Sequence, residues 1–136
     1  MRVMSFGTFD ILHPGHESFL RGARRLGDHL IAVVARDNFV QKAKGRLPFN
    51  NERLRVRQLR RLGIADKVIL GSRTHNWFRT LRTNEIDILA LGYDQKPTVR
   101  ELKKHLRLHR LGKVKVIRLR ALRPEIYKSS KLGNYS

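Results

Sequence analysis

The sequence contains no cysteine among its 136 residues. This absence excludes disulfide bonds and thiolate-bound metal sites, and it is typical of proteins inside the cell. No apolar run approaches the roughly 20 residues that a membrane-spanning helix needs. The first residues also lack the apolar core of a secretory signal peptide, because Gly7, Asp10 and His13 interrupt it. We therefore expect a cytoplasmic protein that does not bind a membrane.

Acidic residues are scarce. Only 11 Asp and Glu oppose 30 Lys and Arg, which leaves a net charge of +19. A protein this basic attracts polyanions such as nucleotides and RNA. The segments 42–61 and 100–123 are rich in Lys and Arg and each contains a single acid. The second of them is a candidate contact surface for RNA or the ribosome.

Strand-like and helix-like patterns alternate along the chain, and the length fits one domain over residues 1–136. Short apolar or alternating runs predict strands at 2–6, 29–35, 66–71, 86–92 and 113–119. Helical spacing predicts helices at 16–26, 50–62, 76–84 and 99–111. This order predicts an α/β fold with a single Rossmann-like, doubly wound sheet of about five parallel strands and helices on both faces.

Smaller features support the predicted helices. Gly27 is expected to end the first helix, and Asn50 or Asn51 to cap the second. In the last helix Leu102, Leu106 and His109 share the spacing of an inward face.

Two polar segments follow predicted strands, GTFDILHPGH at 7–16 and GYDQ at 92–95. Ligands of parallel sheets bind outside the carboxyl ends of the strands, so both segments are expected at the ligand edge. Pro14 suits the first turn of a helix, and the helix start offers free N–H groups to an anion. His13 and His16, three residues apart, would extend that set of donors. This pattern predicts a phosphate site, because no nearby Cys or clear Glu supplies a third metal ligand.

The GTFD segment followed by HPGH resembles the signature of the cytidylyltransferase-like nucleotidylyltransferase family. Further segments resemble family blocks in the same order, namely 36–48, 52–55, LGYDQ at 91–95 and YKSSKL at 127–132. Together they look most like the archaeal FAD synthases within this family. The resemblance implies transfer of AMP from ATP to the phosphate of FMN, which gives FAD and pyrophosphate. It also implies a divalent metal ion, with Mg²⁺ expected.

The resemblance also implies roles for individual residues. His13, His16, Lys44 and Arg55 would be catalytic, with Lys42 as the alternative to Lys44 in a mobile loop. Asp10 would support the histidines or a metal-bound water, so that it is the one candidate near a metal. Contacts to the nucleotide would come from Thr8, Phe9, Gly15, Gly92, Asp94, Gln95, Ser129 and Ser130.

Several alternatives stay open from the sequence. CTP-dependent transfer to glycerol 3-phosphate or a similar polyol or sugar phosphate is the nearest one, and ATP and CTP are not distinguished. A basic RNA- or ribosome-binding module on a nucleotidyltransferase fold is the alternative of another class. The oligomeric state is open, with a homodimer as one candidate. Phe6, Phe9, Phe49, Trp77 and Tyr127 are the aromatic side chains that a flavin pocket could use, although Trp77 by itself reads as a core or interface residue.

Overall fold

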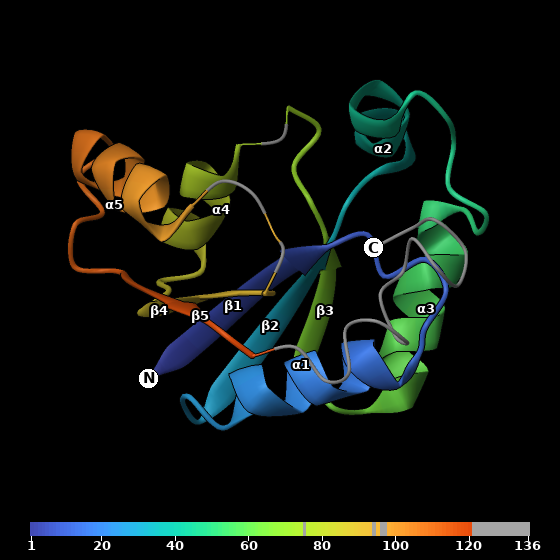
Figure 1. Cartoon of the computed structure of the whole chain (residues 1–136), viewed down its shortest axis with the longest axis horizontal. Coiled ribbons are helices and arrows are strands. Elements are labelled where there is room, and N and C mark those ends of the chain that lie inside the picture. Colours follow the sequence, from blue (N-terminus) through green and yellow to red (C-terminus); the bar gives the residue numbers. More distant parts are fainter. Residues whose placement is uncertain (75, 94, 96–97, 121–136) are drawn as a thin grey trace.

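The computed structural model describes residues 1–74, 76–93, 95 and 98–120. Its strands are β1 (Arg2–Gly7), β2 (His29–Val34), β3 (Lys67–Leu70), β4 (Ile88–Leu91) and β5 (Lys115–Arg118). Its helices are α1 (Pro14–Arg24), α2 (Asp37–Lys44), α3 (Glu52–Leu62), α4 (Trp77–Thr83) and α5 (Val99–Leu108). The five strands form one sheet in the order β3-β2-β1-β4-β5 (Figure 1).

All pairings in this sheet are parallel. From β1 the chain first builds outward through β2 to β3, and then continues on the other side with β4 and β5. The order therefore reverses between β1 and β4, which is the position where sheets of this kind hold nucleotides. The predicted Rossmann-like architecture is confirmed.

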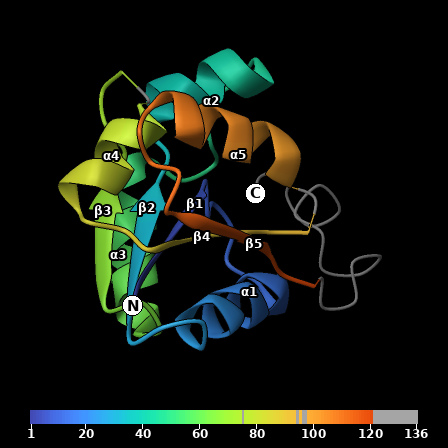
Figure 2. The same ribbon diagram turned by 90° about the vertical axis from the view of Figure 1, so that its left-hand side faces the viewer.

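Two apolar layers cover the sheet. Alternate strand residues face opposite sides, so Val3 packs in one core cluster and Met4 in the other. The first cluster includes Leu20 of α1 and Leu59 of α3, and the second includes Leu81 of α4 and two leucines of α5. Figures 1 and 2 show α1 and α3 on one side of the sheet and α4 and α5 on the other.

The helix α2 is the element that the sequence pattern missed. It buries only Val40, so its apolar residues form no recognisable helical stripe. Gly45 ends it in the left-handed conformation, with φ of 76°. The main chain of Asp37 donates to Glu52 over 2.8 Å, and the main chain of Glu52 donates back to Asp37 over 3.2 Å. These reciprocal bonds join the first residues of α2 and α3.

Two local predictions were wrong and one is confirmed. The helix α1 ends at Arg24 rather than at Gly27. Gly27 instead lies against the main chain of Met1, where an added Cβ would lie 2.3 Å from the Met1 carbonyl oxygen. His109 is exposed because it follows the last turn of α5, and its ring stacks on Phe78 at 4.1 Å. Asn51 is the residue that caps α3, by accepting from Leu54.

Candidate active site

His13 is the N-cap of α1. Its Nδ1 accepts a hydrogen bond from the main-chain N–H of Gly15 over 3.0 Å. In the neutral ring this arrangement leaves the proton on Nε2, which is the donor that a ligand would meet. Pro14 occupies the first helical position, as predicted. The turn therefore presents an imidazole donor at a helix start, where anions are stabilised.

His16 lies one turn further along and is 9% exposed. Its ring stacks on that of His13 with centroids 3.8 Å apart, and it meets the edge of Phe9 at 5.7 Å. Burial lowers the pKa of His16 to about 3, and the nearby charges of His13 and Lys44 contribute to that shift. Burial also lowers the pKa of His13. Burial therefore favours the neutral form of both rings.

The turn between β1 and α1 has a tightly packed start. Phe9 is 2% exposed and adopts a left-handed backbone with φ of 51°. Its ring folds back over Gly7, where an added Cβ would lie 2.8 Å from two ring carbons. The glycine is therefore required for the close approach of the Phe9 ring.

Arg55 of α3 supports this turn through hydrogen bonds. Its side chain is fully buried and donates to the carbonyl oxygen of Thr8 over 2.8 Å and to that of Asn50 over 3.0 Å. Its third nitrogen pairs with the carboxylate of Asp37 at 2.6 Å. With these bonds and no exposure, Arg55 holds the turn in place. The catalytic role that the resemblance implies for Arg55 stays a prediction.

The carboxylate of Asp10 also makes hydrogen bonds within the protein. Its carboxylate is fully buried and accepts from the main chains of Phe49 and Asn50 over 2.6 and 2.7 Å. It anchors the segment that leads into α3. The role beside the histidines or a metal-bound water that the resemblance implies for Asp10 stays a prediction.

The second segment of the site follows β4. The side-chain amide of Gln95 accepts from the main chain of Gly92 over 2.9 Å and donates to the carbonyl oxygen of Phe6 over 2.7 Å. Gln95 thus bridges β4 to β1 where the two strands separate. Arg118 of β5 donates to the carbonyl oxygens of Gly92 and Gln95 over 2.7 and 3.0 Å. The structure therefore brings the two predicted segments together at the reversal point.

Other predicted residues fall into three groups. Thr8 is buried, and Gly15 lies in the first turn of α1. Lys42 and Lys44 are both exposed in the last turn of α2 rather than in a loop, and the charge of Lys44 is the one that acts on His16. Asp94, Ser129 and Ser130 lie outside the described residues, as does Tyr127.

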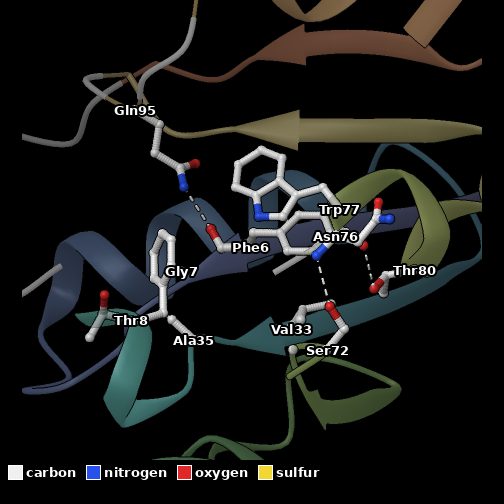
Figure 3. A pocket seen from close by; sticks show the side chains of 12 residues that line it. Phe6, Gly7, Thr8, Val33, Ala35, Ser72, Asn76, Trp77, Thr80 and Gln95 are labelled. Carbon is white, nitrogen blue, oxygen red and sulfur yellow. Dashed lines mark hydrogen bonds between the residues drawn. The ribbon is translucent and has the colours of Figure 1, made fainter. Parts of the chain in front are cut away.

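A cavity of about 160 Å³ opens at the carboxyl ends of β1 and β2, beside α2 and α4 (Figure 3). Its apolar wall comprises Phe6, Val33, Ala35, Phe39 and Trp77. Sequence reasoning named Phe6 and Trp77 as candidates for a flavin pocket but missed the others. The signal was faint, because these side chains come from four separate elements. Of the remaining aromatic candidates, Phe9 packs in the core and Phe49 is 75% exposed.

Two further observations bear on ligands. Among the described residues, no group of three or more His, Cys, Asp or Glu side chains is placed to hold a metal ion. The side chains near the helix start are the imidazoles of His13 and His16, which are not the oxygen ligands that hard cations prefer. Within the described part of the chain, no helix has the length and apolarity that crossing a membrane demands.

Comparison with known proteins shows the family to which the chain is similar. A family model described as cytidylyltransferase-like matches residues 4–133. A protein named FAD synthase from Aciduliprofundum boonei is 44% identical over 120 residues, which are 88% of this chain and 78% of that protein. Another of that name, from Pyrococcus abyssi, is 42% identical over 96% of this chain and 85% of its own length. A crystal structure titled as a lipopolysaccharide core biosynthesis protein from Thermoplasma volcanium is 36% identical. It superposes with a TM-score of 0.83, covering 90% of this chain and 98% of that one.

Proposed function

The chain belongs to the cytidylyltransferase-like family, and on that premise we propose that it is a nucleotidyltransferase that transfers AMP from ATP to FMN. The single observation that carries the choice of substrates is the similarity to proteins named FAD synthase, at 38–45% identity over most of this chain. The stacked histidines at the start of α1 supply a site with the chemistry that such a transfer needs.

In the proposed reaction a phosphate oxygen of FMN attacks the α-phosphorus of ATP. A new P–O bond forms, the bond from the α-phosphorus to the oxygen that bridges it to the β-phosphorus breaks, and pyrophosphate leaves with that electron pair. The protein forms no covalent intermediate, so its contribution is to place the two anions and stabilise the developing charge. The stacked imidazoles of His13 and His16 at the start of α1 are the side chains that we expect to meet such a phosphate.

Two further features support this assignment. Lys44 is the better candidate than Lys42 for neutralising the phosphates, because its charge acts on His16. Gly92 and Gln95 follow β4, and the bond from Gln95 to Phe6 holds them beside the end of β1, where the nucleotide would bind. Gln95 itself acts as a positioning residue, since its side-chain amide is engaged on both strands.

A divalent ion enters this proposal as part of the substrate. The described residues offer no carboxylate cluster for a resident ion, so Mg²⁺ would arrive bound to the phosphate oxygens of ATP. No step of the proposed AMP transfer depends on a protein side chain that binds the Mg²⁺ ion. We place the enzyme in the cytoplasm, where both proposed substrates are present, and a homodimer stays a prediction that the mass in solution tests.

The decisive test offers the purified protein two substrate pairs. With MgATP and FMN we expect FAD and pyrophosphate, detected by chromatography and a coupled phosphate assay. With CTP and glycerol 3-phosphate we expect no CDP-linked product. Formation of the cytidylyl product alone would overturn the flavin assignment and favour the CTP-dependent alternative.

A second proposed function, contact with RNA, rests on a separate observation. Exposed Arg100, Lys103, Lys104 and Arg107 lie on α5, whereas Leu102 and Leu106 turn inward. We propose that this face contacts RNA beside catalysis, because the net charge of +19 exceeds what nucleotide phosphates require. RNA affinity should then fall steeply with salt. Replacing Lys103, Lys104 and Arg107 by Gln should flatten the slope, whereas the same change at exposed Arg53, Arg57 and Arg61 of α3 should not. Equal slopes for the two triple variants would contradict an RNA site on α5.

A further inference from the structure

We propose that the groove between α5 and β5 binds the phosphate backbone of single-stranded RNA. This inference rests on the proposed contact of α5 with RNA, and it names the kind of RNA and the second side of its site. The groove has a volume of about 580 Å³ and lies where α5 covers the β5 edge of the sheet (Figures 1 and 2). The described residues that line it are Lys103, Leu106, Arg107 and residues 112–117.

The free edge of β5 runs along this groove. In the described part of the chain, β5 pairs with β4 alone. The main chains of Lys115 and Leu119 donate to carbonyl oxygens on the β4 side over 2.9 and 2.8 Å. Because successive residues of a strand alternate in direction, the N–H group of Val116 points to the open edge. The edge therefore presents a main-chain donor as well as side chains.

Cations flank this edge on both faces of the sheet. Lys103 and Arg107 lie one turn apart on α5. Val116 packs in the core cluster that contains the leucines of α5, whereas Ile117 packs against the opposite cluster. Lys115 shares the direction of Ile117, so its charge lies on the side of the edge that faces away from α5.

These charges are available to a ligand. Lys103, Arg107, Lys113 and Lys115 are all exposed, and none of them forms an ion pair within the described residues. The part of the groove lining that the structure describes contains no acidic residue. Cations on both sides of one edge match a chain of phosphates, which carries one negative charge per nucleotide.

Single-stranded RNA fits these features better than a duplex or an acidic peptide. An RNA duplex needs a broad surface that spans its grooves, whereas a single strand can bend along a narrow edge. A peptide would add to the sheet through main-chain bonds, but β5 has only four residues, and lysine at an edge opposes such pairing. No aromatic ring is among the described lining residues, so affinity should depend on phosphates and not on base sequence.

The groove lies apart from the candidate active site. It follows β5 from residues before the strand to Ile117, whereas the histidine turn follows the carboxyl end of β1. Saturating RNA should therefore leave the rate of FAD formation unchanged. Inhibition of that rate by RNA would place the RNA at the catalytic face and overturn the groove assignment.

The salt dependence of RNA affinity tests the side of the site that β5 provides. A uridine oligonucleotide is titrated with the full chain at several salt concentrations. Replacing Lys113 and Lys115 by Gln should lower the slope of log affinity against log salt by about 1.4, because each phosphate contact of a single strand contributes about 0.7. The control replaces exposed Arg57 and Lys67 by Gln and should leave the slope unchanged. Lys67 is a matched position, since it begins the other edge strand, β3, as Lys115 begins β5.

The outcomes separate the groove from the wider RNA function. Equal slopes for the two double variants would overturn the groove, although a flattened slope in the α5 triple variant would still support an RNA contact of α5. Absence of any RNA affinity in the unmodified protein would overturn the RNA function itself.

Two competitors test the choice of ligand. Duplex RNA of the same length and polyglutamate should each displace the labelled oligonucleotide at least ten-fold less well than the unlabelled oligonucleotide does. Equal competition by the duplex would overturn the assignment to a single strand. Equal competition by polyglutamate would overturn the assignment to RNA and favour an acidic protein partner.

Discussion

The guanidinium of Arg55 donates a 2.8 Å hydrogen bond to the carbonyl oxygen of Thr8, a residue 47 positions away in the sequence. The bond ties α3 to the end of β1, where the histidine turn begins. The same side chain is paired with Asp37 at the start of α2. One buried cation therefore fixes the relative positions of three chain segments around the candidate active site.

Replacing Arg55 by Met should lower the free energy of unfolding by about 3–5 kcal/mol, because it leaves Asp37 without its buried partner. Urea unfolding measures this loss. Arg53→Met on the exposed side of the same helix is the matched control and should change stability by about 0.5 kcal/mol or less. Wild-type stability in Arg55→Met, together with a large loss of turnover, would instead support a direct contact between Arg55 and substrate.

His16→Asn should lower kcat about 10²–10³-fold, the range found when one preorganised donor to a transition state is removed. Nucleotide Kd should change much less if the histidine acts mainly in the transition state. Single-turnover rates and nucleotide titrations measure the two effects. Equal losses in rate and affinity would make His16 a general binding group rather than a catalytic one.

Stability should decrease on mild acidification. In the unfolded chain an imidazole takes up a proton near pH 6.5, whereas the pKa of His16 in the folded protein is about 3. The unfolded state therefore binds more protons between these values, and the free energy of unfolding falls as the pH falls. At pH 5 the loss from His16 should be about 2 kcal/mol.

Chemical unfolding at pH 7.5 and pH 5 tests this effect. His16→Asn should remove most of the difference between the two pH values, and His105→Asn on exposed α5 should leave it in place. An unchanged pH dependence in His16→Asn would mean that another group dominates acid sensitivity.

Lys44 and Lys42 form a natural pair for comparison, because both are exposed in the last turn of α2. Lys44→Met should raise the KM for ATP or lower kcat at least ten-fold, and Lys42→Met should have little effect. The reason is that only Lys44 contributes its charge at His16. Steady-state kinetics decides between them, and a larger effect at Lys42 would reverse the assignment.

The buried hydroxyl of Ser5 lies in the middle of β1 and has no hydrogen-bond partner among the described residues. Ser5→Ala should therefore be neutral or raise the free energy of unfolding by up to about 1 kcal/mol. Thermal unfolding followed by circular dichroism measures this change. A clear loss of stability would show that the hydroxyl is satisfied in solution.

Much of this fold could be predicted because the strands are short apolar or alternating runs that end at glycine or polar residues. Val3 and Leu30 lie in such runs, and parallel topology follows from the alternation with helices. The helix α2 could not be predicted, since Val40 is its only buried residue. The histidine turn could be predicted because Pro14 and two histidines occur together locally. The role of Arg55 could not, because its partners lie far away in the sequence.

Local sequence patterns also did not predict which residues line the cavity. Ala35, Phe39 and Trp77 are ordinary apolar residues in their own segments, and only the sheet order brings them to one wall. A single sequence gives no indication that these residues lie close together in space. Sequence reasoning therefore finds the histidine turn, which is local in the chain, and misses most of the cavity wall, which is not.

The reciprocal bonds between Asp37 and Glu52 have a consequence for protein engineering. They close residues 38–51 into a loop whose two ends meet. The cost of closing such a loop grows only slowly with its length. A graft between the two carboxylates would have to keep buried Val40 and the bonds of Asp10 to Phe49 and Asn50, so the exposed residues 41–47 are the part whose length can change without rebuilding the sheet.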